Sequence, residues 1–173
     1  SVAGGCVASG IGVAVGLARA GLIPFASSFA AFLVRAADQI RMAGYAKANV
    51  NIVGSHSGIA IGPDGFSQMG LEDIALFRTV WDSIVLSPAD AVCAAALTRL
   101  MMAHPGISYL RTMRNTTPLL YDHTERFRIG GSMTLRSSPS DDVTIIGTGI
   151  TVHEALAAYD MLGAEGISAR VID

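Results

Sequence analysis

A glycine-rich loop holds the polar side chains of this chain that are best suited to ligand chemistry. The loop is Gly54–Asp73, GSHSGIAIGPDGFSQMGLED, and it lies between a short apolar strand pattern and the start of a helix pattern. Ligands commonly bind at strand-to-helix loops of α/β domains. A purely structural loop has little use for His56, Asp64 and Gln68 together. The residues alone therefore indicate a ligand site, with a structural loop as the alternative.

Two aromatic residues and an arginine follow a helical spacing upstream of this loop. Phe29, Phe32 and Arg35 stand at positions i, i+3 and i+6, so a helix would place them roughly along one face. From the spacing alone, Phe29 and Phe32 are ordinary core aromatics. Arg35 has an ion pair with a carboxylate as its simplest interpretation.

The elements that must position these residues alternate between strand and helix patterns. This order predicts an α/β fold: a parallel sheet with helices on both faces, followed by the first βαβ unit of a second α/β domain. The expected helices are Ile11–Arg19 closed by Gly21, one from a Ser27 or Ser28 cap to Tyr45, Leu71–Thr79, one starting at Ser87 and Pro88, and Val152–Gly163. The expected strands are Leu22–Phe25, Asn49–Val53, Ser83–Leu86, Ser108–Arg111, one from Val143 and one from Ser168, with a β-rich edge and linker over Thr116–Pro139.

Composition excludes several classes of function. A net charge of −2 without a basic run argues against nucleic acid binding. No apolar stretch reaches the roughly 18 residues of a membrane span, and the start has no basic region typical of a signal peptide. Cys6 and Cys93 have neither disulfide-framework nor metal-site spacing, so we expect buried thiols in the cytoplasm. Hydrophobic residues make up 51% of the chain and mean hydropathy is +0.48, which predicts apolar surface that a partner covers.

The glycine-rich loop and the helix after it resemble a known family. GSHSGIAIGPDGFSQMGLEDIALFR is similar to the transketolase pattern GSH-x-G-x-x-x-G-x-DG-x-SQM-x-LED-x-A-x-FR. The resemblance extends from about Gly10 to Asp173. Its other matching segments are PFASSFAAFLVRAADQIRM, LSPADAV, GISYLRTMRNTTPLLY and VTIIGTGITVHEALAAYDMLGAEGISARVID. It implies a thiamine diphosphate pyrimidine-binding domain lacking its first strands over residues 1–120, a linker over 121–142, and the beginning of the transketolase C-terminal domain over 143–173.

The resemblance also assigns roles to single residues. It implies that Phe29, Phe32 and Arg35 lie at the cofactor, where flat apolar walls suit the pyrimidine ring. It implies that the substrate side is formed by His56, Asp64, Gln68 and Arg114, which contact sugar hydroxyls or phosphate. Arg114 has a plain surface arginine as its alternative. Pro63 and Phe66 depart from the Glu and Pro of the family, so the loop is expected to differ in shape.

One departure from the family concerns proton transfer. Before the helix at Ile11 the family has the sequence AEQNM, in which the Glu protonates the pyrimidine ring. An alignment without gaps places Val7 at the Glu and Ser9 at the Asn, and no Asp or Glu precedes Asp38. Valine cannot transfer a proton, so no catalytic residue is assigned at this position.

We therefore expect part of a transketolase-type enzyme, inactive as this chain alone, that transfers a two-carbon ketol unit between sugar phosphates. The resemblance implies thiamine diphosphate and Mg²⁺ (or Ca²⁺), whose diphosphate and metal ligands lie outside this chain. The partner would be a second copy or a chain carrying the diphosphate-binding domain. The alternative is a non-catalytic remnant or regulatory partner that retains the fold. A third possibility, deoxyxylulose-phosphate synthase, is disfavoured by the SHSG and SQMGLED spellings.

Overall fold

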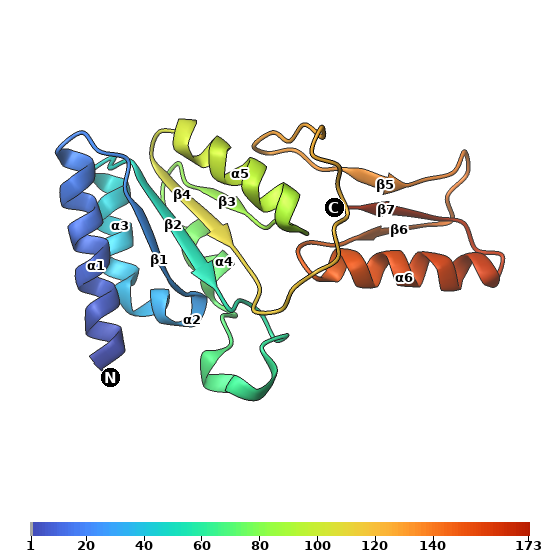
Figure 1. Cartoon of the computed structure of the whole chain (residues 1–173), viewed down its shortest axis with the longest axis horizontal. Coiled ribbons are helices and arrows are strands. Elements are labelled where there is room, and N and C mark those ends of the chain that lie inside the picture. Colours follow the sequence, from blue (N-terminus) through green and yellow to red (C-terminus); the bar gives the residue numbers. More distant parts are fainter. Residues whose placement is uncertain (1) are drawn as a thin grey trace. The chain divides into compact units, whose positions relative to one another are not determined.

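The computed structural model describes residues 2–173, with side chains described from Gly5 onward, and divides the chain into two compact units (Figure 1). The first unit comprises the residues up to Leu86 together with Leu97–Thr116. Its elements are α1 (Val2–Arg19), β1 (Phe25–Phe29), α2 (Ala30–Leu33), α3 (Ala37–Tyr45), β2 (Val50–Ser55), α4 (Asp73–Arg78), β3 (Ile84–Leu86), β4 (Ile107–Arg111) and the second half of α5 (Ala91–Ala103).

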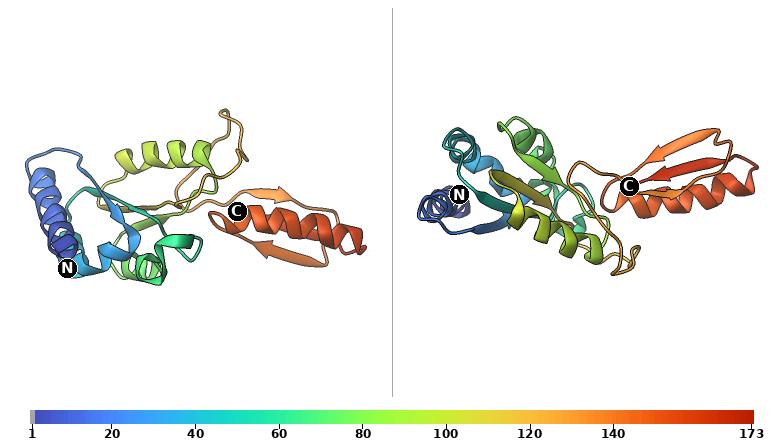
Figure 2. Two further views of the ribbon diagram at one scale, coloured as in Figure 1. Left: turned by 60° about the horizontal axis from the view of Figure 1, so that its bottom comes forward. Right: turned by 90° about the horizontal axis from the view of Figure 1, so that it is seen from above.

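The sheet of the first unit is wholly parallel, with the strand order β1-β2-β4-β3. Its register pairs Phe29 with Ser55 and Gly54 with Arg111, so the carboxyl ends of three strands meet at one edge. Figure 2 shows α3 and α4 on one side of this sheet and the part of α5 from Leu97 onward on the other. The predicted α/β class with a parallel sheet is confirmed.

The hydrophobic core of this unit lies between the sheet and the helices α1 to α4. The fully buried side chains that form it include Ile11, Leu33, Ile40, Ile52, Phe77 and Tyr109. Phe77 of α4 and Tyr109 of β4 stack with ring centroids 3.8 Å apart and planes 5° apart. Burying a side chain of this size stabilises the fold by about 1.5–3 kcal/mol, so this layer holds the strand ends in place.

The second unit contains Ser87–Ala96 and Thr117–Asp173. Its sheet has the order β5-β7-β6, where β6 (Val143–Ile146) is parallel and β5 (Thr134–Arg136) is antiparallel to β7 (Ala169–Ile172). The helix α6 (Thr151–Ala164) buries Val152 and Ala155. The turn from β6 into α6 has no room for a side chain at Gly147, because an added Cβ would lie 2.9 Å from the Cα atom of Val152.

Three predicted elements in the N-terminal half have wrong boundaries. The strand is Phe25–Phe29 rather than Leu22–Phe25, because residues through Phe29 pair with β2. Ser27 and Ser28 therefore lie in the strand and cap no helix, and the helix to Tyr45 is interrupted by a 3₁₀ turn at Val34–Ala36. The first helix also begins well before Ile11.

Three further expectations are corrected. The helix predicted to start at Ser87 and Pro88 begins at Ala91, because the Asp90 carboxylate accepts a 2.7 Å hydrogen bond from the Cys93 N–H and caps it. Cys93 is buried as expected, whereas Cys6 is exposed. In the part of the chain predicted to be β-rich, between Thr116 and Pro139, the structure describes β5 and otherwise turns and irregular chain.

Candidate functional site

Three aromatic rings stack at the carboxyl edge of the parallel sheet. The Phe29 and Phe32 centroids lie 5.4 Å apart with planes 9° apart, and the His56 ring lies 3.8 Å from Phe29 with planes 13° apart. We call these three residues the aromatic stack. Phe29 ends β1, Phe32 belongs to α2 and His56 follows β2, so the strand register brings them together rather than one helix face. The structure therefore groups three flat aromatic rings at this edge of the sheet.

His56 adopts a backbone conformation that is uncommon outside glycine. Its φ is +56°, and its Nδ1 atom lies 3.1 Å from the Ser55 hydroxyl. Such a conformation persists where neighbouring contacts determine it. Here the next residue, Ser57, is buried and bonds the Thr112 carbonyl through both its N–H (3.1 Å) and its hydroxyl (2.9 Å). These bonds fix the place at which the loop leaves the sheet.

The loop after His56 brings two of the predicted substrate residues together. Its 3₁₀ turns are Gly62–Asp64 and Phe66–Gln68. The Nε atom of Arg114 lies 2.9 Å from Oδ2 of Asp64, and both side chains are more than a third exposed. The Oε1 atom of Gln68 is buried and accepts no hydrogen bond from the residues that the structure describes. Arg35 is exposed and takes no part in the aromatic stack.

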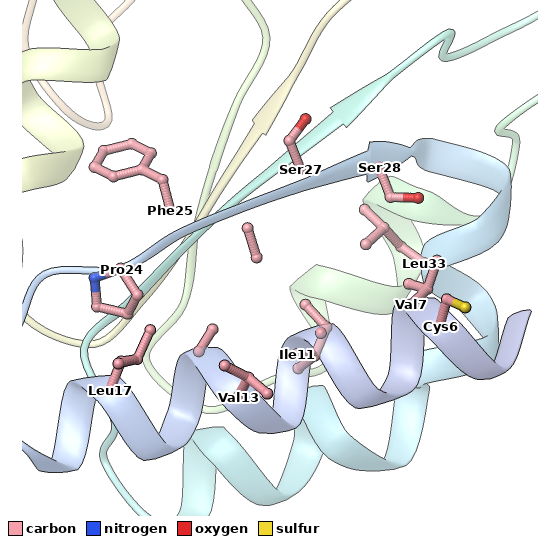
Figure 3. A pocket seen from close by; sticks show the side chains of 13 residues that line it. Cys6, Val7, Ile11, Val13, Leu17, Pro24, Phe25, Ser27, Ser28 and Leu33 are labelled. Atoms are coloured by element: carbon pink, nitrogen blue, oxygen red, sulfur yellow. The ribbon is translucent and has the colours of Figure 1, made fainter. Parts of the chain in front are cut away.

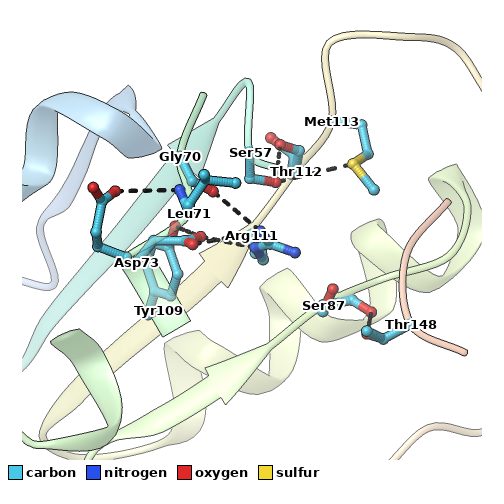
Figure 4. A network of polar contacts seen from close by, with 11 residues as sticks. Ser57, Gly70, Leu71, Asp73, Ser87, Tyr109, Arg111, Thr112, Met113 and Thr148 are labelled. Carbon is cyan, nitrogen blue, oxygen red and sulfur yellow. Dashed lines mark hydrogen bonds and ion pairs between the residues drawn. The ribbon is translucent and has the colours of Figure 1, made fainter. Parts of the chain in front are cut away.

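A buried polar network beneath this loop was not predicted from the sequence. The Asp73 carboxylate is fully buried and accepts hydrogen bonds from the Tyr109 hydroxyl (2.7 Å) and from Nε of Arg111 (2.8 Å) (Figure 4). Nη2 of Arg111 also donates to the Gly70 carbonyl at 3.2 Å. Burial, followed by the charge of Asp73, raises the pKa of Tyr109 above its usual range. These residues come from α4, β4 and the loop, and only the tertiary structure shows that they meet.

Val7, which the alignment places at the position of the family's acid, is partly buried on α1. Figure 3 shows it beside Leu33 at a cavity of about 380 Å³ between α1 and β1. The other lining side chains include Cys6, Ile11, Leu17 and Phe25, and among the lining residues that the structure describes there is no carboxylate. This region therefore offers packing surface rather than a proton donor of the Asp or Glu type.

Among residues 2–173, no three His, Cys, Asp or Glu side chains are grouped so that they could hold a metal ion. Within the same range, no helix has the length and apolar character needed to cross a membrane.

Comparison with known proteins identifies two matching family models. Residues 8–118 match the transketolase pyrimidine binding domain, and residues 132–173 match the transketolase C-terminal domain. The chain is 47% identical over its whole length to transketolase-like protein 1 of Bos taurus and 46% identical over 164 residues to transketolase of Homo sapiens. It spans only about a quarter of the length of these curated relatives, 27% and 26% respectively.

A solved structure shows the same fold. The structure described as "Split gene transketolase, inactive beta4 tetramer" superposes with a TM-score of 0.86 at 39% identity. The match covers 96% of this chain and 54% of that one. The transketolase of Campylobacter jejuni, at 21% identity and a TM-score of 0.81, supports the fold alone. The first domain model covers most of the chain and the relatives are similar over nearly all of it, so the chain belongs to the transketolase family.

Proposed function

We propose that this chain is one component of an enzyme that transfers a two-carbon ketol unit between sugar phosphates with thiamine diphosphate. The observation that carries the proposal is the meeting of the aromatic stack, Gln68 and the Asp64–Arg114 pair around one strand-to-helix loop. A flat apolar surface beside hydrogen-bonding and cationic groups suits a heteroaromatic cofactor and an anionic polyol together. Family membership supports the same reaction.

The aromatic stack fits the aminopyrimidine ring of the cofactor. The imidazole of His56 packs flat on Phe29, and the aminopyrimidine ring would pack against the same group of aromatic side chains. Phe29 and Phe32 would hold the ring, and Arg35 stays a candidate at the edge of this region. The bound cofactor would supply the nucleophilic carbon to which the ketol unit is transferred. We assign its diphosphate and the Mg²⁺ (or Ca²⁺) to a partner chain.

The loop residues would bind the sugar phosphate. Asp64 engages Arg114 at Nε, which is the inner nitrogen of the guanidinium group. The terminal amino groups of Arg114 would then bind a phosphate, which arginine binds through paired hydrogen bonds. The buried Oε1 atom of Gln68 would accept a hydrogen bond from a sugar hydroxyl, since a buried acceptor without a partner is costly. His56 and Asp64 would contact further hydroxyl groups.

A second candidate function rests on Val7. Its side chain packs against the core beside Leu33, and none of the described side chains that line the adjacent cavity is a carboxylate. A chain that keeps the fold without an acid at this place would be a non-catalytic or regulatory partner. Under either candidate we propose assembly with a second chain, by analogy with the relative that is described as a split-gene transketolase tetramer.

A mixing experiment tests the proposal and separates the two candidates. The 173-residue chain is assayed alone and with an added chain that contains a transketolase diphosphate-binding domain. Both samples contain thiamine diphosphate, Mg²⁺, xylulose 5-phosphate and ribose 5-phosphate. We expect no turnover by the chain alone and turnover by the mixture, and a mixture containing Phe29→Ala should lose it.

The remaining outcomes each favour another conclusion. Calorimetric binding of the cofactor by the mixture without turnover would support the non-catalytic candidate. Turnover by the chain alone would contradict the assignment of the diphosphate and the metal to a partner. A mixture that binds neither cofactor nor sugar phosphate would overturn both candidates.

A further inference from the structure

We propose that Arg111 is a positioning residue that holds the whole substrate loop, Ser57–Gly70, against the sheet. This inference deepens the proposed function and rests on it for its consequence in catalysis. Arg111 ends β4, and its guanidinium group reaches two places at the far end of the loop. Nε and Nη2 donate to the Asp73 carboxylate at 2.8 and 3.4 Å, and Nη2 donates to the Gly70 carbonyl at 3.2 Å.

The residues packed around Asp73 fix the geometry of this contact. Asp73 is the first residue of α4 and has no exposed surface, so its carboxylate depends on the partners that the fold supplies. Tyr109, two residues before Arg111 on the same strand, donates its hydroxyl to the same carboxylate. A side chain on Gly54 of β2 would collide with that hydroxyl. The glycine at position 54 thus leaves the space that the Tyr109 hydroxyl occupies when it donates to Asp73.

Gly70 connects this network to both ends of the loop. Its carbonyl accepts the N–H of Gly58 at 2.8 Å as well as the bond from Arg111, so the two ends of the loop are joined. An added Cβ on Gly70 would lie 2.5 Å from the Cβ of Ala30. Ala30 directly follows Phe29 of the aromatic stack. A displacement at Gly70 would therefore disturb the cofactor side and the substrate side together.

The same strand end carries Arg114. The chain continues from Arg111 through Thr112, which bonds Ser57 and Gly54, to Arg114, which pairs with Asp64 inside the loop. The loop is thus attached to the chain after β4 at its start, its middle and its end. Of these attachments, Arg111 is the charged one that is largely buried, with 13% of its side chain exposed. The Arg114–Asp64 pair is more exposed, at 39% and 34%.

A purely structural role of the Arg111–Asp73 ion pair would have a different consequence from a positioning role. If Arg111 only stabilises the fold, its loss would increase the rate of hydrogen exchange throughout the first unit. If Arg111 is a positioning residue, its loss would increase exchange selectively in Ser57–Gly70.

Two sets of substitutions separate these effects. Arg111→Lys keeps the charge but cannot reach Asp73 and Gly70 as a rigid fork. The double variant Arg111→Met/Asp73→Asn removes the buried charge that Arg111→Met alone would leave unpaired.

The experiment measures hydrogen exchange of backbone amides in the 173-residue chain, comparing peptides from Ser57–Gly70 with peptides from α3. Arg41→Met is the matched control, because Arg41 also pairs with an aspartate, Asp38 at 2.7 Å, on an exposed surface. We expect exchange in the loop to become about 10- to 100-fold faster in Arg111→Lys and in the double variant. Exchange in α3, and throughout the Arg41→Met chain, should change little.

An equal acceleration of the loop and α3, or an unchanged loop, would overturn the positioning role. In the active mixture described above, Arg111→Lys should raise KM for xylulose 5-phosphate by about tenfold or more, with a smaller effect on kcat. If the unmodified mixture shows no turnover, the proposed function fails while the exchange result still decides the role of Arg111. If turnover is normal and KM is unchanged in Arg111→Lys, the consequence for substrate binding is wrong.

Discussion

The Nε atom of Arg114 lies 2.9 Å from Oδ2 of Asp64, so two residues that the sequence assigns to the substrate are paired with each other. An ion pair this exposed contributes only about 0–1 kcal/mol to stability. The pair therefore adds little to the stability of the fold, and we propose that it presents the guanidinium group to the substrate. This distinction allows a variant at Arg114 to be interpreted through binding rather than through unfolding.

Replacement of Arg114 by methionine should weaken binding of a sugar phosphate. Loss of a charged hydrogen-bond partner costs about 1.5–3 kcal/mol, which corresponds to roughly 10- to 150-fold in affinity. Calorimetric titration of the mixture with xylulose 5-phosphate measures it. Arg78→Met is the control, since Arg78 is exposed on α4. Equal affinities in the two variants would remove Arg114 from the phosphate site.

Replacement of Phe29 by alanine should weaken binding of thiamine diphosphate to the mixture by about tenfold or more, because the central ring of the aromatic stack is lost. The matched control is Phe25→Ala on the same strand, whose side chain is 43% exposed and lies outside the stack. Titration with the cofactor provides the measurement. A loss of similar size in Phe25→Ala would indicate an effect on β1 as a whole.

Introduction of an acid at Val7 should increase activity if the alignment is right. A positioned acid contributes about 10²–10⁴-fold to rate. We expect Val7→Glu to raise turnover of the mixture and to promote deuterium exchange at the thiazolium carbon of the cofactor. Recovery should be partial, because Leu33 and Ile11 provide an apolar surrounding. Val13→Glu, on an exposed part of α1, is the control. Full activity of the unmodified mixture would show that Val7 does not occupy the position of the acid.

Stability should depend on pH through Asp173. Burial raises the pKa of this carboxyl group, and the neighbouring Asp90 acts in the same direction, while the Tyr121 hydroxyl and His153 oppose the shift. The folded chain therefore holds the proton more tightly than the unfolded chain. The contribution of protonated Asp173 to the free energy of unfolding is fully present below the ordinary Asp pKa of 3.8. It is lost as pH rises through the raised pKa of the folded chain.

Denaturant unfolding between about pH 3 and pH 7 checks this sign, a window that spans the ordinary pKa of Asp and rises above it. The free energy of unfolding of the unmodified chain should fall relative to that of Asp173→Asn as pH increases. Asp122 and Asp141 also contribute to the pH dependence, because hydrogen bonds lower their pKa values and their stabilising contributions are lost as pH falls. These contributions are the same in the unmodified chain and the variant, so they cancel in the comparison. Asp160→Asn, at an exposed site, should leave the slope unchanged. A parallel pair of curves for Asp173→Asn would contradict the prediction.

Self-association of the purified chain is expected from its exposed apolar side chains. Trp81 is 76% exposed, and Phe66 and Ile59 are 88% and 74% exposed. Apolar surface of this kind favours association. Light scattering over a series of concentrations around the micromolar range should show a dimer or larger species. A monodisperse monomer that binds no hydrophobic dye would argue against the prediction.

Local sequence was sufficient for the fold class because periodicity and order are local properties. Alternating strand and helix patterns predict a parallel α/β sheet, and the GSHSG and SQMGLED segments predict the family. Local signals also placed β2, α4, β3, β4, α6 and β7 to within a few residues. They failed at Ser27 and Ser28, which read as helix caps. Pairing of these residues with Val53 and Gly54 in β2 outweighs their capping preference.

The sequence by itself determined which residue types are present around the loop and to which family the chain belongs. Only the tertiary structure decided that His56 stacks on Phe29, that Asp64 pairs with Arg114, and that Asp73 is buried beneath Arg111. The physical reason is that these contacts join residues at least 27 positions apart. Their formation depends on the strand order β1-β2-β4-β3 and its register, which no local propensity encodes.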